Sequence, residues 1–123
     1  MAVKKKILLI EDNAPIRENT VELLELSDYE VIIAQNGKEG IEIACIETPD
    51  LILCDIMMPE MDGYAVLKYI RNESPIRNTP LIFFTASSEK KQLEEGLKMG
   101  ADAYIVKPFD SDELIQLIER HIR

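Results

Sequence analysis

Short apolar runs alternate with segments of helical spacing along the chain. Runs of this length suit strands that are buried on both faces of a sheet. The predicted strands are Lys6–Ile10, Glu30–Ala34, Asp50–Cys54, Pro80–Phe84 and Ala103–Val106. Between them, apolar residues recur three or four positions apart, which is typical of amphipathic helices. The predicted helix faces contain Ile16, Thr20, Leu23 and Leu24; Ile41, Ala44, Cys45 and Thr48; Val66, Leu67 and Ile70; Leu93 and Leu97; and Leu114, Leu117, Ile118 and Ile122.

This alternation predicts an α/β fold in which a five-stranded parallel sheet is doubly wound, with helices on both faces. A chain of 123 residues has room for one domain, so residues 1–123 are expected to form a single unit. In sheets of this kind, the functional site lies beyond the carboxyl ends of the strands. The residues that directly follow each predicted strand are therefore the first candidates for chemistry.

Charged and hydroxyl side chains follow four of the predicted strands. They are Glu11, Asp12, Asp55, Thr85 and Lys107. Carboxylates that lie close together raise one another's pKa unless a cation neutralises them. Lys107 supplies one positive charge, and clustered carboxylates also bind hard divalent cations. Two structural alternatives stay open: Glu11 and Asp12 cap the first helix, and Asp55 forms a buried ion pair with Lys107.

The residues after the first strand argue against stable nucleotide binding. A phosphate-binding loop needs small residues whose backbone N–H groups face the anion, whereas Glu11 to Pro15 reads EDNAP and repels it. A phosphoryl group can approach when a metal bridges it to the carboxylates. Asp55, beside a divalent metal, an ammonium and a hydroxyl, is then arranged as a nucleophile toward phosphorus.

Overall charge narrows the choice of partners and compartment. Lys and Arg number 14 against 23 Asp and Glu, so the net charge of −9 argues against nucleic acid and anionic membranes. The apolar stretch Ile7–Ile10 is too short for a signal peptide, which favours a cytoplasmic protein. Cys45 and Cys54 are expected to be core thiols.

Five motifs, in this order and at this spacing, resemble the receiver domain of two-component response regulators, the CheY-like fold. They are Ile7–Asp12, Leu53–Pro59 with Met61–Gly63, Phe83–Ala86, Gly100–Tyr104 and Val106–Phe109. The resemblance covers essentially the whole chain. It implies a (βα)5 flavodoxin-like fold with strand order 2-1-3-4-5.

The resemblance also implies a role for each residue of the site. Asp55 would accept the phosphoryl group. Mg2+ or Mn2+ would be held by Glu11, Asp12, Asp55 and the backbone carbonyl of Met57. Lys107 would contact one phosphoryl oxygen.

The same resemblance implies a switch. Thr85 would hydrogen-bond a second phosphoryl oxygen, and Tyr104 would turn inward as Thr85 moves. The Lys107–Pro108 peptide bond would be cis, and Met57 and Ser87 would influence the phosphoryl lifetime. The surface of the fourth helix, fifth strand and fifth helix would then change shape.

The implied partners are a sensor histidine kinase or phosphotransfer protein as donor and a separate output protein. The surface around Tyr104 is a candidate for phosphorylation-linked homodimers. No output domain follows Arg123 in this sequence, so we expect a stand-alone regulator or a domain from a longer protein. Self-phosphorylation and self-dephosphorylation would be its only catalysis.

Two other functions compete with this interpretation. A phosphorylation-independent adaptor would keep the fold and signal by contacts alone. A metal-dependent phosphohydrolase would use Asp55 as nucleophile and an acid two residues later, but that position is Met57, which cannot transfer a proton.

Overall fold

The computed structural model describes residues 3–73, 75–86 and 90–122. The elements within these ranges are β1 (Lys6–Ile10), α1 (Ala14–Leu26), β2 (Glu30–Ala34), α2 (Gly37–Glu47), β3 (Leu51–Asp55), α3 (Gly63–Arg71), β4 (Leu81–Thr85), α4 (Lys90–Met99), β5 (Ala103–Val106) and α5 (Ser111–His121). In this part of the chain, no helix is both long and apolar enough to cross a membrane.

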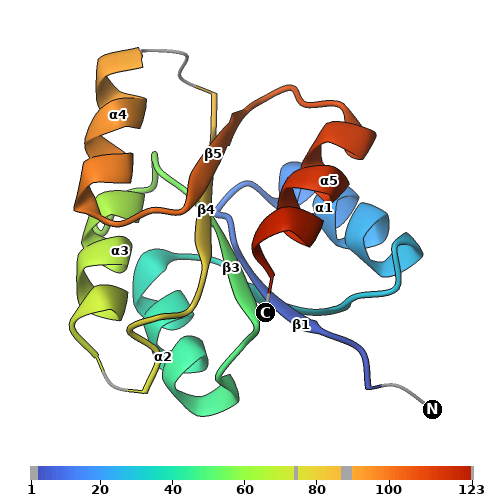
Figure 1. Ribbon diagram of the computed structural model, residues 1–123, viewed down its shortest axis with the longest axis horizontal. Helices are drawn as coiled ribbons and strands as arrows, with labels where there is room; N and C mark the ends of the chain where they lie inside the picture. The colour runs from blue at the N-terminus through green and yellow to red at the C-terminus, as the bar shows by residue number, and fades with distance from the viewer. Residues whose placement is uncertain (1–2, 74, 87–89, 123) are drawn as a thin grey trace.

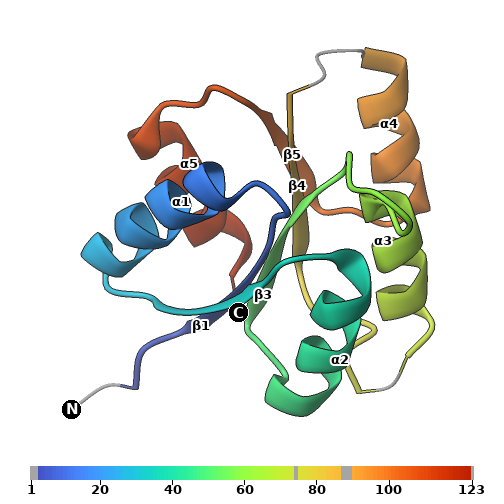
Figure 2. The ribbon, with the colours of Figure 1, turned by 180° about the vertical axis from the view of Figure 1, so that it is seen from behind.

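The strands form one parallel sheet in the order β2-β1-β3-β4-β5, which confirms the predicted fold. Helices α1 and α5 cover one face, and α2, α3 and α4 cover the other (Figures 1 and 2). Each face has its own apolar core, because side chains of a strand point alternately to its two sides. The buried central strands β3 and β4 are apolar until their last residues, Asp55 and Thr85.

Two strands lie one residue later than predicted. The prediction placed Asp50 and Pro80 at their starts, whereas β3 begins at Leu51 and β4 at Leu81. Asp55 pairs with Phe84 in the sheet, and Thr85 pairs with Val106. The two polar residues are therefore the last members of the strands, so the sheet itself fixes their backbone.

Local capping contacts position the helices around this edge. Asn13, and neither Glu11 nor Asp12, is the N-cap of α1, because its side chain accepts a hydrogen bond of 3.0 Å from the backbone N–H of Ile16. Asp62 caps α3, where its side chain accepts a hydrogen bond of 2.9 Å from the backbone N–H of Ala65. The capping alternative for the acidic pair is therefore not what the structure shows.

Three positions on the predicted helix faces are exposed. The expectation that Cys45 is a core thiol is wrong, because it lies at the surface of α2, while Cys54 is buried. Thr48 ends α2 in a left-handed conformation, and the Leu97 residue is 39% exposed. A helix that packs on a sheet buries only a narrow stripe of its surface. Prediction from residue spacing alone included positions beside that stripe, which are exposed.

Candidate functional site

The site lies where β1, β3, β4 and β5 end at the same edge of the sheet. Ile10 pairs with Cys54, so Glu11 and Asp55 leave neighbouring strands at the same level. Lys107 follows β5, and its backbone N–H donates to the carbonyl of Thr85 at 2.7 Å. The topology therefore brings together the residues that the sequence predicted at the strand ends.

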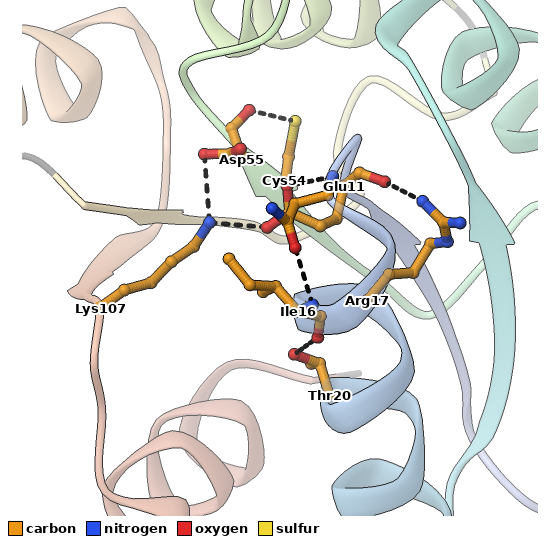
Figure 3. Close-up of polar contacts among 8 residues, drawn as sticks. Glu11, Ile16, Arg17, Thr20, Cys54, Asp55 and Lys107 are labelled. Carbon is orange, nitrogen blue, oxygen red and sulfur yellow. Dashed lines mark hydrogen bonds and ion pairs between the residues drawn. The ribbon is translucent and has the colours of Figure 1, made fainter.

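An ammonium bridges two carboxylates at the centre of the site (Figure 3). Lys107 Nζ donates to Glu11 Oε1 at 2.6 Å and lies 3.6 Å from Asp55 Oδ1. The side chain of Lys107 is 13% exposed, and the Glu11 and Asp55 residues are buried. These charges interact in a medium of low polarity, where their attraction is stronger than in water.

Glu11 is held by donors on three sides. Besides Lys107, the backbone N–H of Asn13 donates to Glu11 Oε2 at 3.2 Å, and Arg17 Nη1 donates to the Glu11 backbone carbonyl at 2.9 Å. Burial works to raise the pKa of Glu11, but hydrogen bonds to Lys107 and Asp55 and the Lys107 charge hold that pKa below its ordinary value. Glu11 is therefore the fixed anion of the site.

The pKa of Asp55 is shifted in the opposite direction, above its ordinary value. Burial raises its pKa, and a hydrogen bond to Glu11 and the charges of Glu11 and Asp12 add to the rise. Lys107 opposes them, and the pKa stands at about 7. Burial followed by the hydrogen bond to Glu11 also raises the pKa of the more exposed Asp12. With all three carboxylates ionised, the site therefore carries more negative charge than the Lys107 ammonium balances.

Three carboxylates offer oxygens to a cation. Glu11, Asp12 and Asp55 each provide one oxygen, and these atoms lie within 4.8 Å of one another. An all-oxygen set of hard donors suits Mg2+ or Mn2+ and not a soft metal. The excess negative charge at the site also favours a cation. The residues present therefore fit a divalent ion.

An aromatic pair lies beneath Lys107. The Nζ atom is 4.4 Å from the centroid of the Phe84 ring, and the Phe84 residue is fully buried at the end of β4. Phe109 packs edge-on against Phe84, with ring centroids 6.5 Å apart and planes inclined by 62°. The ammonium thus has a carboxylate pair on one side and a ring face on another.

The loop after β3 passes close to the start of α3. The backbone N–H of Gly63 donates to the Ile56 carbonyl at 2.8 Å, and a Cβ at Gly63 would lie 2.5 Å from the Asp55 carbonyl oxygen. Met57, two residues past Asp55, is 68% exposed. The Cys54 thiol donates to the Asp55 carbonyl at 3.2 Å. These contacts hold the backbone at Asp55 and directly after it in place.

The predicted switch residues lie on adjacent strands. Thr85 is fully buried, and Tyr104 in β5 is half-buried beside a pocket of about 210 Å³ on α5. The Lys107–Pro108 peptide bond is cis, the form that the resemblance implies. Ser87 lies outside the described residues. The lifetime roles of Met57 and Ser87 stay predictions.

The sequence did not predict the residues that hold the acidic side chains and Lys107 in place. Arg17, Asn13 and Phe84 contact the acidic residues or Lys107 directly. The position of Arg17 could have predicted its contact. Arg17 lies in the first turn of α1, from which a long side chain can reach back to the loop that contains Glu11. For Phe84 there was no such signal, because an aromatic residue in a strand is ordinary core.

The model of the response regulator receiver domain family matches residues 7–119 of the chain. A probable transcriptional regulator, ycf27, from Cyanophora paradoxa is 41% identical over 120 residues, which are 98% of this chain and 49% of that protein. The chain spans about half the length of the curated relatives it matches.

Solved structures match over nearly the whole chain. The chemotaxis protein CheY4 of Vibrio cholerae has a TM-score of 0.92 and 30% identity, and the match covers 98% of this chain and 100% of that one. The receiver domain of a sensor histidine kinase from Pseudomonas aeruginosa has a TM-score of 0.87 and 32% identity, with 97% and 98% coverage. That structure has a magnesium ion coordinated in its active-site cleft.

Proposed function

The chain belongs to the receiver domain family of two-component response regulators, and we propose on this premise that Asp55 accepts a phosphoryl group and that a protein-interaction surface responds. One observation carries the proposal. A buried carboxylate, Asp55, lies 3.6 Å from an ammonium and within a cluster of oxygen ligands at the open edge of the sheet.

The proposed step is a phosphoryl transfer. An Asp55 carboxylate oxygen attacks the phosphorus of a phosphohistidine, the phosphorus–nitrogen bond breaks, and the imidazole leaves with the bonding electron pair and takes up a proton. The product is an acyl phosphate on Asp55. Lys107 stabilises the negative charge on the transferred oxygens, because its ammonium already lies between Glu11 and Asp55.

Glu11, Asp12 and Asp55 would hold the divalent ion, together with the Met57 carbonyl that the resemblance assigns. When bound, Mg2+ supplies positive charge that offsets repulsion between the carboxylates and the incoming phosphoryl oxygens. The magnesium in the Pseudomonas receiver domain supports this choice of ion. Glu11 contributes by keeping its charge, and Arg17 contributes by anchoring its backbone.

The proposed output runs through the neighbouring strands. The new dianionic group offers strong acceptors to Lys107 and Thr85. Thr85 pairs with Val106, and the half-buried Tyr104 lies two residues before Val106 in the same strand. Movement of Thr85 would therefore change the packing around Tyr104, beside α5. Phosphorylation shifts the balance of two conformations by its different interaction with each.

A histidine kinase or phosphotransfer protein is the proposed donor. An apolar groove of about 430 Å³ lies beside Lys107, between α1 and the segment after β5, where it includes Ile16 and Phe109. Lys107, which lies 3.6 Å from the acceptor Asp55, lines this groove, so the groove would give a protein donor an apolar contact near the site. The output would be a separate partner, a second copy of this chain, or a further part of a longer protein, since the chain spans about half the length of its relatives.

We place turnover of a separate substrate outside this function. The residue two positions after Asp55 is Met57, which has no proton to transfer to a leaving group. An adaptor that works without phosphorylation is the second candidate, because an intact acidic site is compatible with unused chemistry. The two functions differ in whether Asp55 is ever modified.

Intact mass measurement separates these functions. The protein is incubated with acetyl phosphate and Mg2+ beside two variants, Asp55→Asn and Asp28→Asn, the second being a matched change at an exposed aspartate far from the site. We expect one added phosphoryl group on wild type and on Asp28→Asn, and none on Asp55→Asn or with a chelator.

Two outcomes would contradict the proposal. An adduct on Asp55→Asn would place the acceptor elsewhere. No adduct on folded wild type with any small phosphodonor or histidine-phosphorylated protein would favour the adaptor.

A further inference from the structure

The ring beneath Lys107 has a role that the phosphoryl chemistry leaves unassigned. We propose that Phe84 is a positioning residue, which holds the Lys107 ammonium at the acidic cluster through the face of its ring. This inference rests on the proposed function, because the ammonium matters most when a phosphoryl group is transferred. It concerns a residue that touches neither the donor nor the acceptor oxygens.

The geometry around the ammonium supports this role. Lys107 Nζ lies 4.4 Å from the Phe84 ring centroid, within the distance at which a ring face attracts a cation. Phe84 is fully buried, and Phe109 meets it edge-on at 6.5 Å. The ring therefore has a fixed orientation. Phe84 lies in β4 and pairs with Ile105 of the adjacent β5, two residues before Lys107.

The two carboxylates hold the ammonium unequally, since Nζ is 2.6 Å from Glu11 but 3.6 Å from Asp55. The Phe84 ring adds a third attraction, which neither carboxylate supplies. The ring face attracts the ammonium without accepting an N–H in a fixed direction. The ring therefore helps to fix the position of Nζ, while the N–H groups still donate to carboxylate and phosphoryl oxygens.

The surroundings make the ring face effective. The Lys107 side chain is 13% exposed, and attraction between a cation and a ring strengthens as water is removed. An aliphatic side chain at position 84 would fill the same space and exclude water but would carry no field toward the ammonium. The proposal therefore concerns the electron density of the ring and not its bulk.

Fluorinated phenylalanines test this distinction, because fluorine withdraws electron density from the ring face with little change of shape. Phenylalanine, its 4-fluoro form, its 3,5-difluoro form and its 3,4,5-trifluoro form are placed at position 84 by site-specific incorporation. The rate of phosphoryl uptake from acetyl phosphate at fixed Mg2+ is then followed by intact mass. We expect the logarithm of the rate to fall stepwise, reaching about a tenfold loss at the trifluoro form.

Phe83 provides the matched control at the neighbouring position. It is nearly fully buried on the opposite face of the same strand, where it packs against Tyr64 with ring centroids 5.6 Å apart. The same series at position 83 adds the same fluorines to β4 away from Lys107. We expect uptake rates there to stay within twofold of wild type. Equal rates across the position 84 series, or the same decline at position 83, would overturn the proposal.

A second measurement keeps this proposal separate from the proposed function. The exchange of the Lys107 ammonium protons with water is measured by NMR in the unphosphorylated protein. It should accelerate along the position 84 series and stay unchanged along the position 83 series; a flat result at position 84 would overturn the proposal. If wild type takes up no phosphoryl group, the proposed function fails, and the exchange series still decides whether the ring holds the ammonium.

Discussion

Glu11 and Asp55 show how differently two buried carboxylates behave in one site. Glu11 receives a hydrogen bond from Lys107 at 2.6 Å and another from the Asn13 backbone, so its charged form is stabilised. Asp55 is 3.6 Å from the same ammonium and faces two other carboxylates. The acceptor therefore has the least stable negative charge of the cluster until a cation or a phosphoryl group changes the balance.

This imbalance predicts a pH-dependent stability for the metal-free protein. The pKa of Asp55 is about 7 in the folded protein against an ordinary 3.8, so between pH 4 and 7 the folded state binds more protons than the unfolded state. Its contribution to the free energy of unfolding therefore falls as pH rises through this window. Replacing Asp55 with Asn should remove that fall, leaving the variant more stable than wild type at pH 8 in the presence of a chelator.

The shift of Asp55 alone corresponds to about 4 kcal/mol. The Asn variant also changes the hydrogen bond between positions 55 and 11 that helps to lower the pKa of Glu11, which offsets part of this gain. We therefore expect a gain of about 2 kcal/mol for Asp55→Asn at pH 8, shrinking toward zero at pH 4. Urea unfolding of both proteins at several pH values measures it. Parallel pH curves for the two proteins would show that Asp55 does not titrate in this range.

Residue identity alone predicted the reacting groups but not their support. Glu11, Asp55 and Lys107 are recognisable because charged residues that follow buried strands are unusual. The ring face of Phe84 depends on where the Lys107 side chain folds back, which no spacing encodes. Cys45 shows the reverse error, since its apolar character predicted burial that the narrow contact stripe of α2 does not provide.

At the scale of elements, the periodic pattern predicted every strand and helix that positions the site, and the errors are at strand ends. The pattern stopped β3 and β4 before Asp55 and Thr85 because both residues are polar. Pairing with the neighbouring strand carries the backbone one residue further. Hydrophobic periodicity reports where side chains are buried, whereas strand ends are set by backbone pairing.

The contact between α3 and the loop after β3 depends on a missing side chain. A Cβ at Gly63 would lie 2.5 Å from the Asp55 carbonyl oxygen and 2.8 Å from Ile56 Cα, both backbone atoms that cannot rotate away. Gly63→Ala should therefore push the start of α3 off the loop and lower the free energy of unfolding by about 2 kcal/mol. Because this loop begins directly after Asp55, phosphoryl uptake should also slow.

Gly40→Ala is the comparison variant for this prediction. A Cβ there would meet the side chain of Ile10, which has rotatable bonds, so the loss of stability should be smaller and the Asp55 loop undisturbed. Urea unfolding and uptake from acetyl phosphate measure both effects. If Gly40→Ala costs as much stability and slows uptake equally, close backbone approach at Gly63 is not the reason for the glycine.

At the scale of the whole molecule, the parallel topology concentrates charge. All five strands end at one edge, so a chain with a net charge of −9 places three carboxylates within one ligand set there. Repulsion between these carboxylates makes the folded state less stable than it would be with neutral residues at the same edge. A ligand that binds only the assembled cluster should therefore stabilise the whole fold and not just the loop that it touches.

Magnesium should act in this way. Because the three carboxylates converge only in the folded chain, the free energy of unfolding should rise with Mg2+ concentration, by about 1.4 kcal/mol at ten times the dissociation constant. The measurement is urea unfolding across a Mg2+ series, with NaCl matched for ionic strength to account for screening of the general negative charge.

Two variants test whether the gain comes from this cluster. Asp12→Asn removes one proposed ligand and should lose most of the gain. Asp28→Asn should keep it, because Asp28 lies outside the cluster at an exposed ion pair with Lys4. An equal rise in NaCl, or a full gain in Asp12→Asn, would mean that the carboxylates at the sheet edge do not form the metal site.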